Sequence, residues 1–242
     1  MRIPRIYVAG LTAINDSVTL EGQAAKHLLQ VLRVKPGQPV VIFDGSGTEY
    51  QAEILTATRG SVEASVISRA AVSRESNLSI TLVQAISRGE RMDWVLQKAT
   101  ELGVARIIPV FSKRSMVKLD KKRLQSRIEH WQAILAHACE QCGRNRLPEL
   151  ATPMALTSVM NELPAGSNSF YLEPDCDSRF RQLGRSETVN LFVGPEGGFD
   201  PEEKAFMTGK DVKPVYLGPR ILRTETAGIA AIAALGVLWG DM

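Results

Sequence analysis

Short runs of apolar residues alternate with helical patterns through most of the chain after residue 77. The runs lie at 80–86, 107–111, 170–172, 189–193 and 215–217. Runs that are apolar throughout, rather than at alternate positions, are typical of strands buried on both faces of a parallel sheet. The pattern therefore predicts an α/β domain built around a mainly parallel sheet.

Two helices between these runs are marked by their ends as well as by their apolar faces. The first is predicted to begin at Ser87, with Glu90 completing a capping box, and to end before Gly103. The second is predicted over 120–142, with Gly143 as its C-terminal cap. Their apolar faces consist of Met92, Val95, Leu96, Ala99 and Leu102 in the first helix, and Leu124, Ile128, Trp131, Leu135, Ala138 and Cys142 in the second.

The first 70 residues follow a different pattern. Residues 39–43 form an apolar run, hydrophobic residues alternate with polar ones over 48–54 and 62–66, and one helix is predicted over 23–33. Short strands at this spacing predict a small β-barrel. Because the stretch 69–77 is polar and aperiodic, it is predicted to be a connection. We expect a first domain at 1–70, a linker at 71–77 and a second domain at 78–242.

The composition is that of a globular protein. Of 242 residues, 44% are hydrophobic and 23% are charged, which excludes a mainly disordered chain, a collagen and a coiled coil. The apolar stretch 227–239 is shorter than the roughly 20 residues that cross a bilayer, and the N-terminus has no sustained apolar run of a secretory signal. Three cysteines are too few to staple a secreted scaffold. We therefore expect a cytoplasmic protein with reduced thiols and no membrane partner.

The net charge of +3 hides an uneven distribution. Residues 86–127 carry 11 Lys or Arg against 4 Asp or Glu, whereas residues 128–242 carry 10 against 15. A basic segment of this kind indicates a polyanionic partner, and a solvated helix face is the alternative explanation. The candidate phosphate contacts are Arg2, Arg5, Lys26, Arg33, Arg88, Arg91, Lys113, Arg114, Lys121 and Lys122.

Cys139 and Cys142 form a C-x-x-C pair, which raises metal and redox interpretations. A zinc site needs about four ligands, and the sequence shows no second pair of ligands. A redox pair belongs at the start of a helix, whereas this pair lies at the end of one. We therefore interpret the cysteines as structural, expect no metal, and interpret His130 and His137, near the apolar face of the same helix, as packing residues.

A glycine-rich loop follows the strand predicted at 189–193. The segment reads LFVGPEGGFDPEE over 191–203, in which Asp200 caps a helix, Pro201 takes its first position and Glu203 completes a capping box. The acidic first turn would repel a phosphate, and neither nucleotide-binding glycine pattern is matched. The loop is therefore predicted to surround a neutral or cationic ligand.

A second loop, at 218–223, connects the last predicted strand to an unusually apolar helix. The loop carries Arg220 and Arg223, and Thr224 is predicted to cap the helix. Residues 227–239 are apolar nearly all round, so this helix is expected to be buried on every side, in the core and at a subunit interface.

These segments together resemble one family. The sequences FVGPEGGFDPEE, YLGPRILRTETAGIAA, CEQCGRNRLPE and the opening MRIPRIY are similar to those of the bacterial 16S rRNA (uracil-N3)-methyltransferases, the RsmE family of SPOUT methyltransferases. The resemblance covers essentially the whole chain. It implies an N-terminal PUA-like β-barrel, a C-terminal α/β domain tied in a deep trefoil knot, a homodimer, and S-adenosylmethionine bound in the knot.

The resemblance also implies where the cofactor binds and which residues act on the substrate. The cofactor-binding residues expected from it are Leu172, Gly194, Pro195, Glu196, Gly197, Gly198, Leu217, Gly218, Ile221, Leu222, Arg223, Thr224, Glu225, Thr226 and Ala227. Uracil N3 carries a proton that must leave, and negative charge develops on the base as it does. The candidates for stabilising that charge are Arg223 and Arg144, and the candidates for accepting the proton are Glu225 and Glu196.

The implied activity is methylation of N3 of a uridine in the 16S rRNA of the small ribosomal subunit, at uridine 1498 in the customary rRNA numbering. Two alternatives stay open at this point. One is a SPOUT enzyme that acts on another rRNA or tRNA base, and the other is a non-catalytic RNA-binding module.

Overall fold

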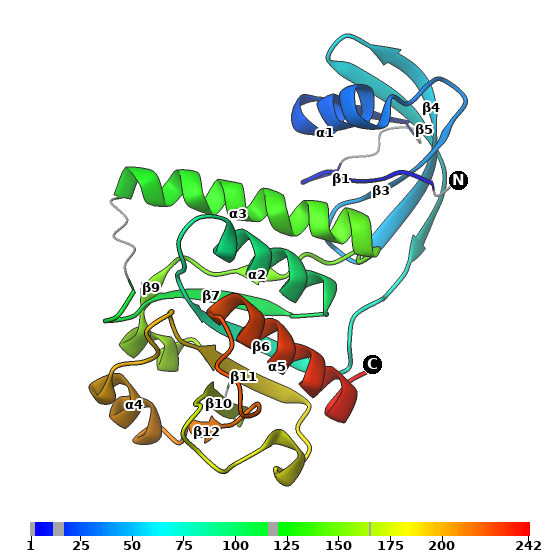
Figure 1. The fold of residues 1–242 in the computed structure, drawn as a ribbon. Coiled ribbons are helices and arrows are strands. Elements are labelled where there is room, and N and C mark those ends of the chain that lie inside the picture. Colours follow the sequence, from blue (N-terminus) through cyan, green and yellow to red (C-terminus); the bar gives the residue numbers. More distant parts are fainter. Residues whose placement is uncertain (1–2, 12–16, 116–120, 165) are drawn as a thin grey trace. The chain divides into compact units, whose positions relative to one another are not determined.

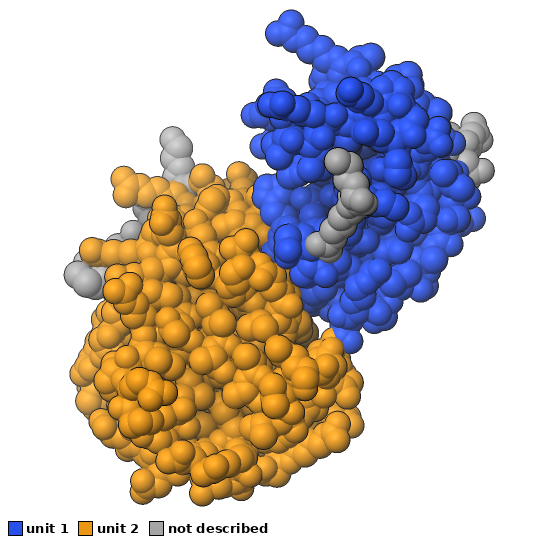
Figure 2. All heavy atoms as spheres, turned by 45° about the vertical axis from the view of Figure 1, so that its right-hand side comes forward, with its two compact units in different colours: residues 1–75, 136–147 blue, residues 76–135, 148–242 orange. Residues whose placement is uncertain are grey.

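The chain divides into two units, which are coloured separately in Figure 2. The computed structural model describes residues 3–11, 17–115, 121–164 and 166–242, with the backbone alone at residues 121 and 122. Unit 1 comprises residues 1–75 and 136–147, and unit 2 comprises residues 76–135 and 148–242. The domain boundary expected from sequence assigned residues 136–147 to the second domain, whereas their contacts place them in the first unit.

Unit 1 contains a five-stranded sheet. Its strands lie in the order β1-β3-β4-β5-β2, and every pair except the parallel β1 and β3 is antiparallel. Register shifts between β4 and β5, at Gln51/Ala52 and Ile54/Thr56, mark β-bulges, which bend strands. The strands span Arg5–Tyr7 (β1), Ser17–Leu20 (β2), Pro39–Phe43 (β3), Thr48–Thr58 (β4) and Ser61–Ala71 (β5), so the three strands predicted from sequence are confirmed.

The helix predicted over 23–33 consists of two different parts. An α-helix, α1 (Gly22–Lys26), continues directly into a π-helix, η1 (His27–Leu32), which ends at Arg33 in the left-handed conformation with φ of 51°. Ala25 and Leu28 are fully buried against the sheet residues of the unit 1 core. The helix thus covers the core of unit 1, and the prediction missed only its change of winding.

Unit 2 contains a parallel sheet, as the apolar runs predicted. The strand order is β12-β10-β11-β6-β7-β8, with β9 pairing separately with β7, and every pair is parallel. The strands span Ser79–Ala85 (β6), Arg106–Phe111 (β7), Glu149–Leu150 (β8), Met154–Ala155 (β9), Asn168–Leu172 (β10), Thr188–Val193 (β11) and Lys213–Val215 (β12).

Both faces of this sheet are buried. In β11, Leu191 packs into a core shared with α2 (Glu90–Glu101) and α5 (Thr224–Trp239), and the next residue, Phe192, packs into a second core. That second core includes residues of α4 (Pro201–Thr208) and of the 3₁₀-helix η2 (Leu156–Asn161), and Figure 1 shows α4 on the side of the sheet opposite α2 and α5. A second 3₁₀-helix, η3 (Phe180–Gln182), precedes β11.

The helix ends in unit 2 agree only partly with the predictions. Helix α2 begins at Glu90 with Gly89 as its N-cap, so the capping box predicted at Ser87 is wrong. At its other end, the amides of Gly103 and Val104 donate to the carbonyls of Thr100 and Ala99, and Gly103 has a φ of 87°, which confirms the glycine cap. Helix α3 (Lys121–Cys142) ends before Gly143, as predicted.

Helix α5 is buried on one side only within this chain. Leu235 and Gly236 are buried, but the next two residues, Val237 and Leu238, are 65% and 44% exposed. Burial in the core is therefore confirmed for one side of the helix, and the expected burial of its other side at a subunit interface stays a prediction. Among the described residues, no helix has the length and apolarity needed to cross a membrane. The trefoil knot stays a prediction.

Candidate cofactor-binding and active site

A cavity lies where three neighbouring strands of unit 2 end. Because β10, β11 and β12 are parallel, with Leu172 opposite Val215 in register, the loops that follow them meet at one edge of the sheet. Ligands of open α/β sheets bind at this edge. The cavity has a volume of about 460 Å³ and is lined by Arg91, Leu172, Glu173, Pro174, Val193, Gly194, Pro195, Glu196, Gly198, Val215, Leu217, Gly218, Arg220, Ile221, Leu222, Arg223, Thr224 and Ala227.

The first loop, 194–198, is folded tightly. The amide of Gly198 donates to the carbonyl of Pro195 at 2.8 Å, and Gly198 has a φ of 67°, which favours glycine. A Cβ atom at Gly194 would lie 3.2 Å from the amide nitrogen of Phe199 and 3.3 Å from the carbonyl carbon of Gly198. A side chain at Gly194 would therefore require the backbone at Gly198 and Phe199 to shift by a few tenths of an ångström.

The capping box at the start of α4 holds the far end of this loop, as predicted. The Asp200 carboxylate accepts from the amide of Glu202, and the Glu203 carboxylate accepts from the amide of Asp200 at 2.9 Å. The buried Glu203 also accepts hydrogen bonds from the Ser112 hydroxyl at 3.0 Å and the Lys113 amide at 2.8 Å. The end of β7 thus fixes the position of α4.

Thr224 joins the two loops. It was predicted to cap α5, but Arg223 occupies the N-cap position and Thr224 is the first helical residue. Its buried hydroxyl donates to the carbonyl of Gly194 at 2.6 Å and accepts from the Gln84 side chain at 3.1 Å. One hydroxyl therefore ties the start of the first loop to α5 and to β6.

Arg91 and Glu196 line the cavity, and Glu225 lies beside Arg91 without lining it. Arg91 of α2 donates to Glu196 at 2.6 Å, and its Nε lies 4.0 Å from Glu225 of α5. Glu225 is 14% exposed, and its Oε2 is buried without a hydrogen-bond partner in the described part of the chain. On another side of the cavity the buried Glu173 is paired with Lys204 at 2.5 Å. Apart from Arg91, Arg220 and Arg223, the lining is mainly apolar or glycine, with the carboxylates of Glu173 and Glu196 among it. These carboxylates favour a ligand that is neutral or positively charged.

The structure brings together most of the residues expected to hold the cofactor. Gly197, Glu225 and Thr226 do not line the cavity. A Cβ atom at Gly197 would face the side chain of Arg114, whose Nη1 donates to the Gly197 carbonyl at 2.9 Å. The expected residues at the cavity are Leu172, Gly194, Pro195, Glu196, Gly198, Leu217, Gly218, Ile221, Leu222, Arg223, Thr224 and Ala227.

The sequence interpretation missed several lining residues. Glu173 and Pro174 directly follow a predicted strand, so their place at a carboxyl end was a usable signal. Arg91 was expected to contact RNA, and its place at the cavity depends on how α2 packs. The other missed residues are Val193, Val215 and Arg220.

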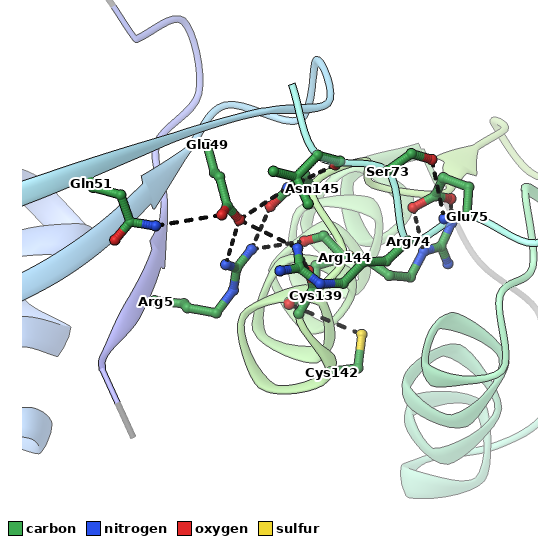
Figure 3. A network of polar contacts seen from close by, with 12 residues as sticks. Arg5, Glu49, Gln51, Ser73, Arg74, Glu75, Cys139, Cys142, Arg144 and Asn145 are labelled. Carbon is green, nitrogen blue, oxygen red and sulfur yellow. Dashed lines mark hydrogen bonds and ion pairs between the residues drawn. The ribbon is translucent and has the colours of Figure 1, made fainter. Parts of the chain in front are cut away.

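Two residues with expected functional roles belong instead to a polar network inside unit 1 (Figure 3). Arg144, a candidate for stabilising charge, is 4% exposed and pairs with Glu75; it does not line the cavity. Arg5, a candidate phosphate contact, has an 8% exposed side chain and donates to Glu49 at 2.9 Å and to Asn145. Burial raises the pKa of the Glu49 carboxyl, but hydrogen bonds from Arg5, Asn145 and Arg74 outweigh it, and the net pKa is lowered.

The other candidate phosphate contacts differ in their surroundings. Lys113 pairs with Glu202, and Arg114 holds the first loop of the cavity, so both are engaged within unit 2. Lys26, Arg33 and Arg88 are exposed. Arg2 and the side chains of Lys121 and Lys122 lie outside the described residues.

The cysteines and histidines of α3 lie in different environments. Cys139 is buried and donates to the carbonyl of Arg146; a hydrogen bond with Cys142 and burial raise the pKa of its thiol, which supports a structural role. His130 and His137 are both exposed, so their interpretation as packing residues is wrong. His130 forms a contact of 2.9 Å with Asp93.

Comparison with known proteins decides the family. A model of the RNA methyltransferase domain matches residues 74–236, and a model of the RNA methyltransferase PUA domain matches residues 20–67. A ribosomal RNA small subunit methyltransferase E of Buchnera aphidicola is 34% identical over 100% of this chain and 98% of its own length. The chain belongs to this family of RNA methyltransferases. The corresponding protein of Mycobacterium bovis is 32% identical over 96% of this chain and 90% of its own length.

Two solved structures of methyltransferases share this fold over their whole length. A putative methyltransferase of Legionella pneumophila, in complex with the cofactor SAM, is 39% identical with a TM-score of 0.96 and full coverage of both chains. A ribosomal RNA small subunit methyltransferase E of Neisseria gonorrhoeae, bound to S-adenosyl methionine, is 37% identical with a TM-score of 0.94 and 99% coverage of both. The fold of this methyltransferase, with its PUA-like first unit and parallel-sheet second unit, is thus the one predicted.

Proposed function

We propose that this methyltransferase transfers a methyl group from S-adenosylmethionine to N3 of a uridine in the 16S rRNA of the small ribosomal subunit. The observation that carries the proposal is the cavity at the ends of β10, β11 and β12, built from the two loops that resemble the family's cofactor loops. Its volume of about 460 Å³ is within the usual range of small-molecule sites. The relatives named above are rRNA methyltransferases, which favours rRNA over tRNA, and uridine 1498 is the position implied by the resemblance.

The residues at the cavity fit this cofactor. Gly194 and Gly198 place a tightly folded stretch of backbone at the cavity wall, while Leu172 and Leu222 supply apolar surface for an adenosyl moiety. Glu173 and Glu196 place carboxylates around a ligand that carries a positive sulfonium. The cofactor supplies the methyl group. The protein must bind the cofactor, orient the uracil and accept the proton that leaves N3.

We assign the two chemical tasks to Arg223 and Glu196, since both line the cavity. Arg223 stabilises the negative charge that develops on the uracil as N3 loses its proton. Glu196 accepts that proton through one carboxylate oxygen, while Arg91 holds the other oxygen at 2.6 Å. Glu225, which meets Arg91 but not the cavity, is a positioning residue.

Methyl transfer from labelled S-adenosylmethionine to unmethylated small subunits tests this assignment. Glu196→Gln keeps the hydrogen-bond acceptor for Arg91 but not the proton acceptor, so we expect kcat to fall by about 100-fold or more with little change in cofactor affinity. Glu225→Gln serves as the matched control and should retain most of the rate. A Glu196→Gln enzyme at full rate would contradict the role of Glu196, and a wild-type chain that binds RNA but transfers no methyl group would favour a non-catalytic RNA-binding module.

We further propose that two copies of the chain pair through α5. The face of this helix with the exposed Val237 and Leu238 is apolar, and water contact with such a surface is unfavourable. A homodimer would bury it and account for a helix that is apolar all round. Light scattering at micromolar protein should give the mass of a dimer for wild type and of a monomer for Val237→Asp; a monomeric wild type with full activity would contradict the proposal. An rRNA substrate also favours a cytoplasmic location for the enzyme.

A further inference from the structure

Unit 1 brings together three side chains of types that bind metal ions, and the proposed methyl transfer does not use them. His27 is the first residue of η1, and His137 and Glu140 lie one turn apart near the end of α3. A ring nitrogen of each histidine and a carboxylate oxygen of Glu140 all lie within 4.8 Å of one another. We propose that His27, His137 and Glu140 form a binding site for a divalent transition-metal ion, with Zn²⁺ as the best match.

The geometry is close to that of a coordinated ion. Ligands of a tetrahedral zinc ion lie about 2.0–2.2 Å from it and therefore about 3.3–3.5 Å from one another. The donor atoms of this group have to approach by no more than about 1.5 Å to reach that spacing. The rings of His27 and His137 are already 5.6 Å apart at their centres, and His137 is exposed, so its ring is free to turn.

The carboxylate of the group is already oriented. The amide of Tyr7 in β1 donates to Oε1 of Glu140 at 2.9 Å, and hydrogen bonds of this kind hold metal ligands in place. Within the described ranges of the chain, Glu140 forms no ion pair with a lysine or arginine, so a cation would balance its charge.

The types of ligand select the metal. Two imidazoles and one carboxylate, with a fourth position left for water, are a ligand set that zinc accepts, whereas Ca²⁺ and Mg²⁺ prefer oxygen ligands alone. The thiol of Cys139 is occupied by the carbonyl of Arg146, which makes the C-x-x-C pair a poor competitor. No metal was expected from the sequence, because no second pair of ligands accompanies the cysteines, whereas the three ligands of this site come from two distant elements.

A bound ion would join η1 to the last turns of α3. Since the ion binds the folded unit and no preformed site exists in the unfolded chain, it would stabilise unit 1. This role is independent of the proposed methyl transfer, and it requires no ion in the cofactor cavity.

Metal binding by the full chain, stripped with a chelator, tests the proposal. Titration calorimetry with ZnCl₂ should show one ion per chain, and the thermal midpoint should rise in its presence. Co²⁺ as a spectroscopic probe should give the visible absorption of a four- or five-coordinate site without the intense near-ultraviolet band of thiolate ligation.

Variants separate the site from adventitious binding. His137→Ala, at an exposed position, and Glu140→Gln, which keeps an acceptor for the Tyr7 amide, should each weaken Zn²⁺ binding by about tenfold or more. His130→Ala, another exposed histidine of α3, should bind like wild type, and circular dichroism checks that each variant is folded. Binding that is absent in wild type, unchanged in His137→Ala and Glu140→Gln, or lost only in Cys142→Ser would overturn the proposal.

Discussion

Removing the hydroxyl of Thr224 tests how the two loops of the cofactor site are held together. Thr224→Val keeps the size and branching of the side chain but removes the hydroxyl that bridges Gly194 and Gln84. The buried carbonyl of Gly194 then loses the hydrogen bond of 2.6 Å, and Gln84 keeps only its bond to the carbonyl of Ala85 at 3.0 Å. Each buried polar group left unsatisfied costs about 1–3 kcal/mol.

We expect Thr224→Val to lower the free energy of unfolding by about 1–3 kcal/mol, since only the Gly194 carbonyl loses this partner while the Gln84 side chain retains one. The same bond holds the first loop in position for the cofactor. If about 1.4–2.8 kcal/mol of binding free energy is needed to restore the loop to its cofactor-binding position, the affinity for S-adenosylmethionine drops by about 10- to 100-fold. Titration calorimetry and urea unfolding measure the two effects separately.

Two control variants sharpen this experiment. Thr224→Ser restores the hydroxyl and should recover most of the affinity. Thr226→Val makes the same chemical change at an exposed position of α5 that does not line the cavity, and should behave as wild type. If Thr224→Val and Thr226→Val had the same affinity and stability, the proposed role of the hydroxyl in joining the loops would be wrong.

Three further predictions follow from single contacts. Gly194→Ala should weaken cofactor binding because its Cβ would meet the backbone of Phe199 at 3.2 Å, whereas Gly197→Ala, whose Cβ would face Arg114 at 3.6 Å, should bind nearly normally in calorimetry. Glu49→Gln should destabilise the protein by about 3–5 kcal/mol at neutral pH because it leaves the buried charge of Arg5 without a carboxylate to balance it, while Glu53→Gln, exposed on the same strand, should not. Because the pKa of Glu49 is lowered in the folded protein, this carboxylate stabilises the fold above its ordinary pKa of 4.5, and the stabilisation is lost as the pH falls further. In urea unfolding across this pH range, the free energy of unfolding should therefore decrease less steeply with acid in Glu49→Gln than in wild type. Arg114→Ala should reduce cofactor affinity by about two- to tenfold through the lost bond to Gly197, and an affinity equal to that of Lys26→Ala would contradict it.

Local sequence patterns predicted the positions of helices and strands more accurately than they predicted which residues contact each other. The apolar runs of unit 2 located β6, β7, β10 and β11 to within two residues, because burial on both faces of a parallel sheet demands such runs. The run predicted at 215–217 extends beyond the end of β12 at Val215, because Leu217 lines the cavity and is not part of the strand. Ser87 matched a capping box, but α2 begins three residues later.

The candidate site was predictable where its residues share a loop and unpredictable where they meet through packing. Gly194 and Gly218 stand in recognisable loops. Arg91 reaches the cavity only because α2 lies beside it, and Arg5 is buried because Glu49 and Asn145, 44 and 140 residues away, converge on it. Charge counted along the chain could not distinguish Arg114, which holds a loop, from an exposed lysine such as Lys26.

Mapping the modified nucleotide in rRNA is the most direct test of the proposed methyl transfer. A methyl group on N3 of uracil blocks base pairing, so primer extension on 16S rRNA stops at the modified position. We expect a stop at uridine 1498 in rRNA from the parent strain and no stop in a strain that lacks this protein. The stop should return when the wild-type chain, but not the Glu196→Gln variant, is supplied. A stop that persists without the protein, or a loss at another rRNA or tRNA position instead, would contradict it.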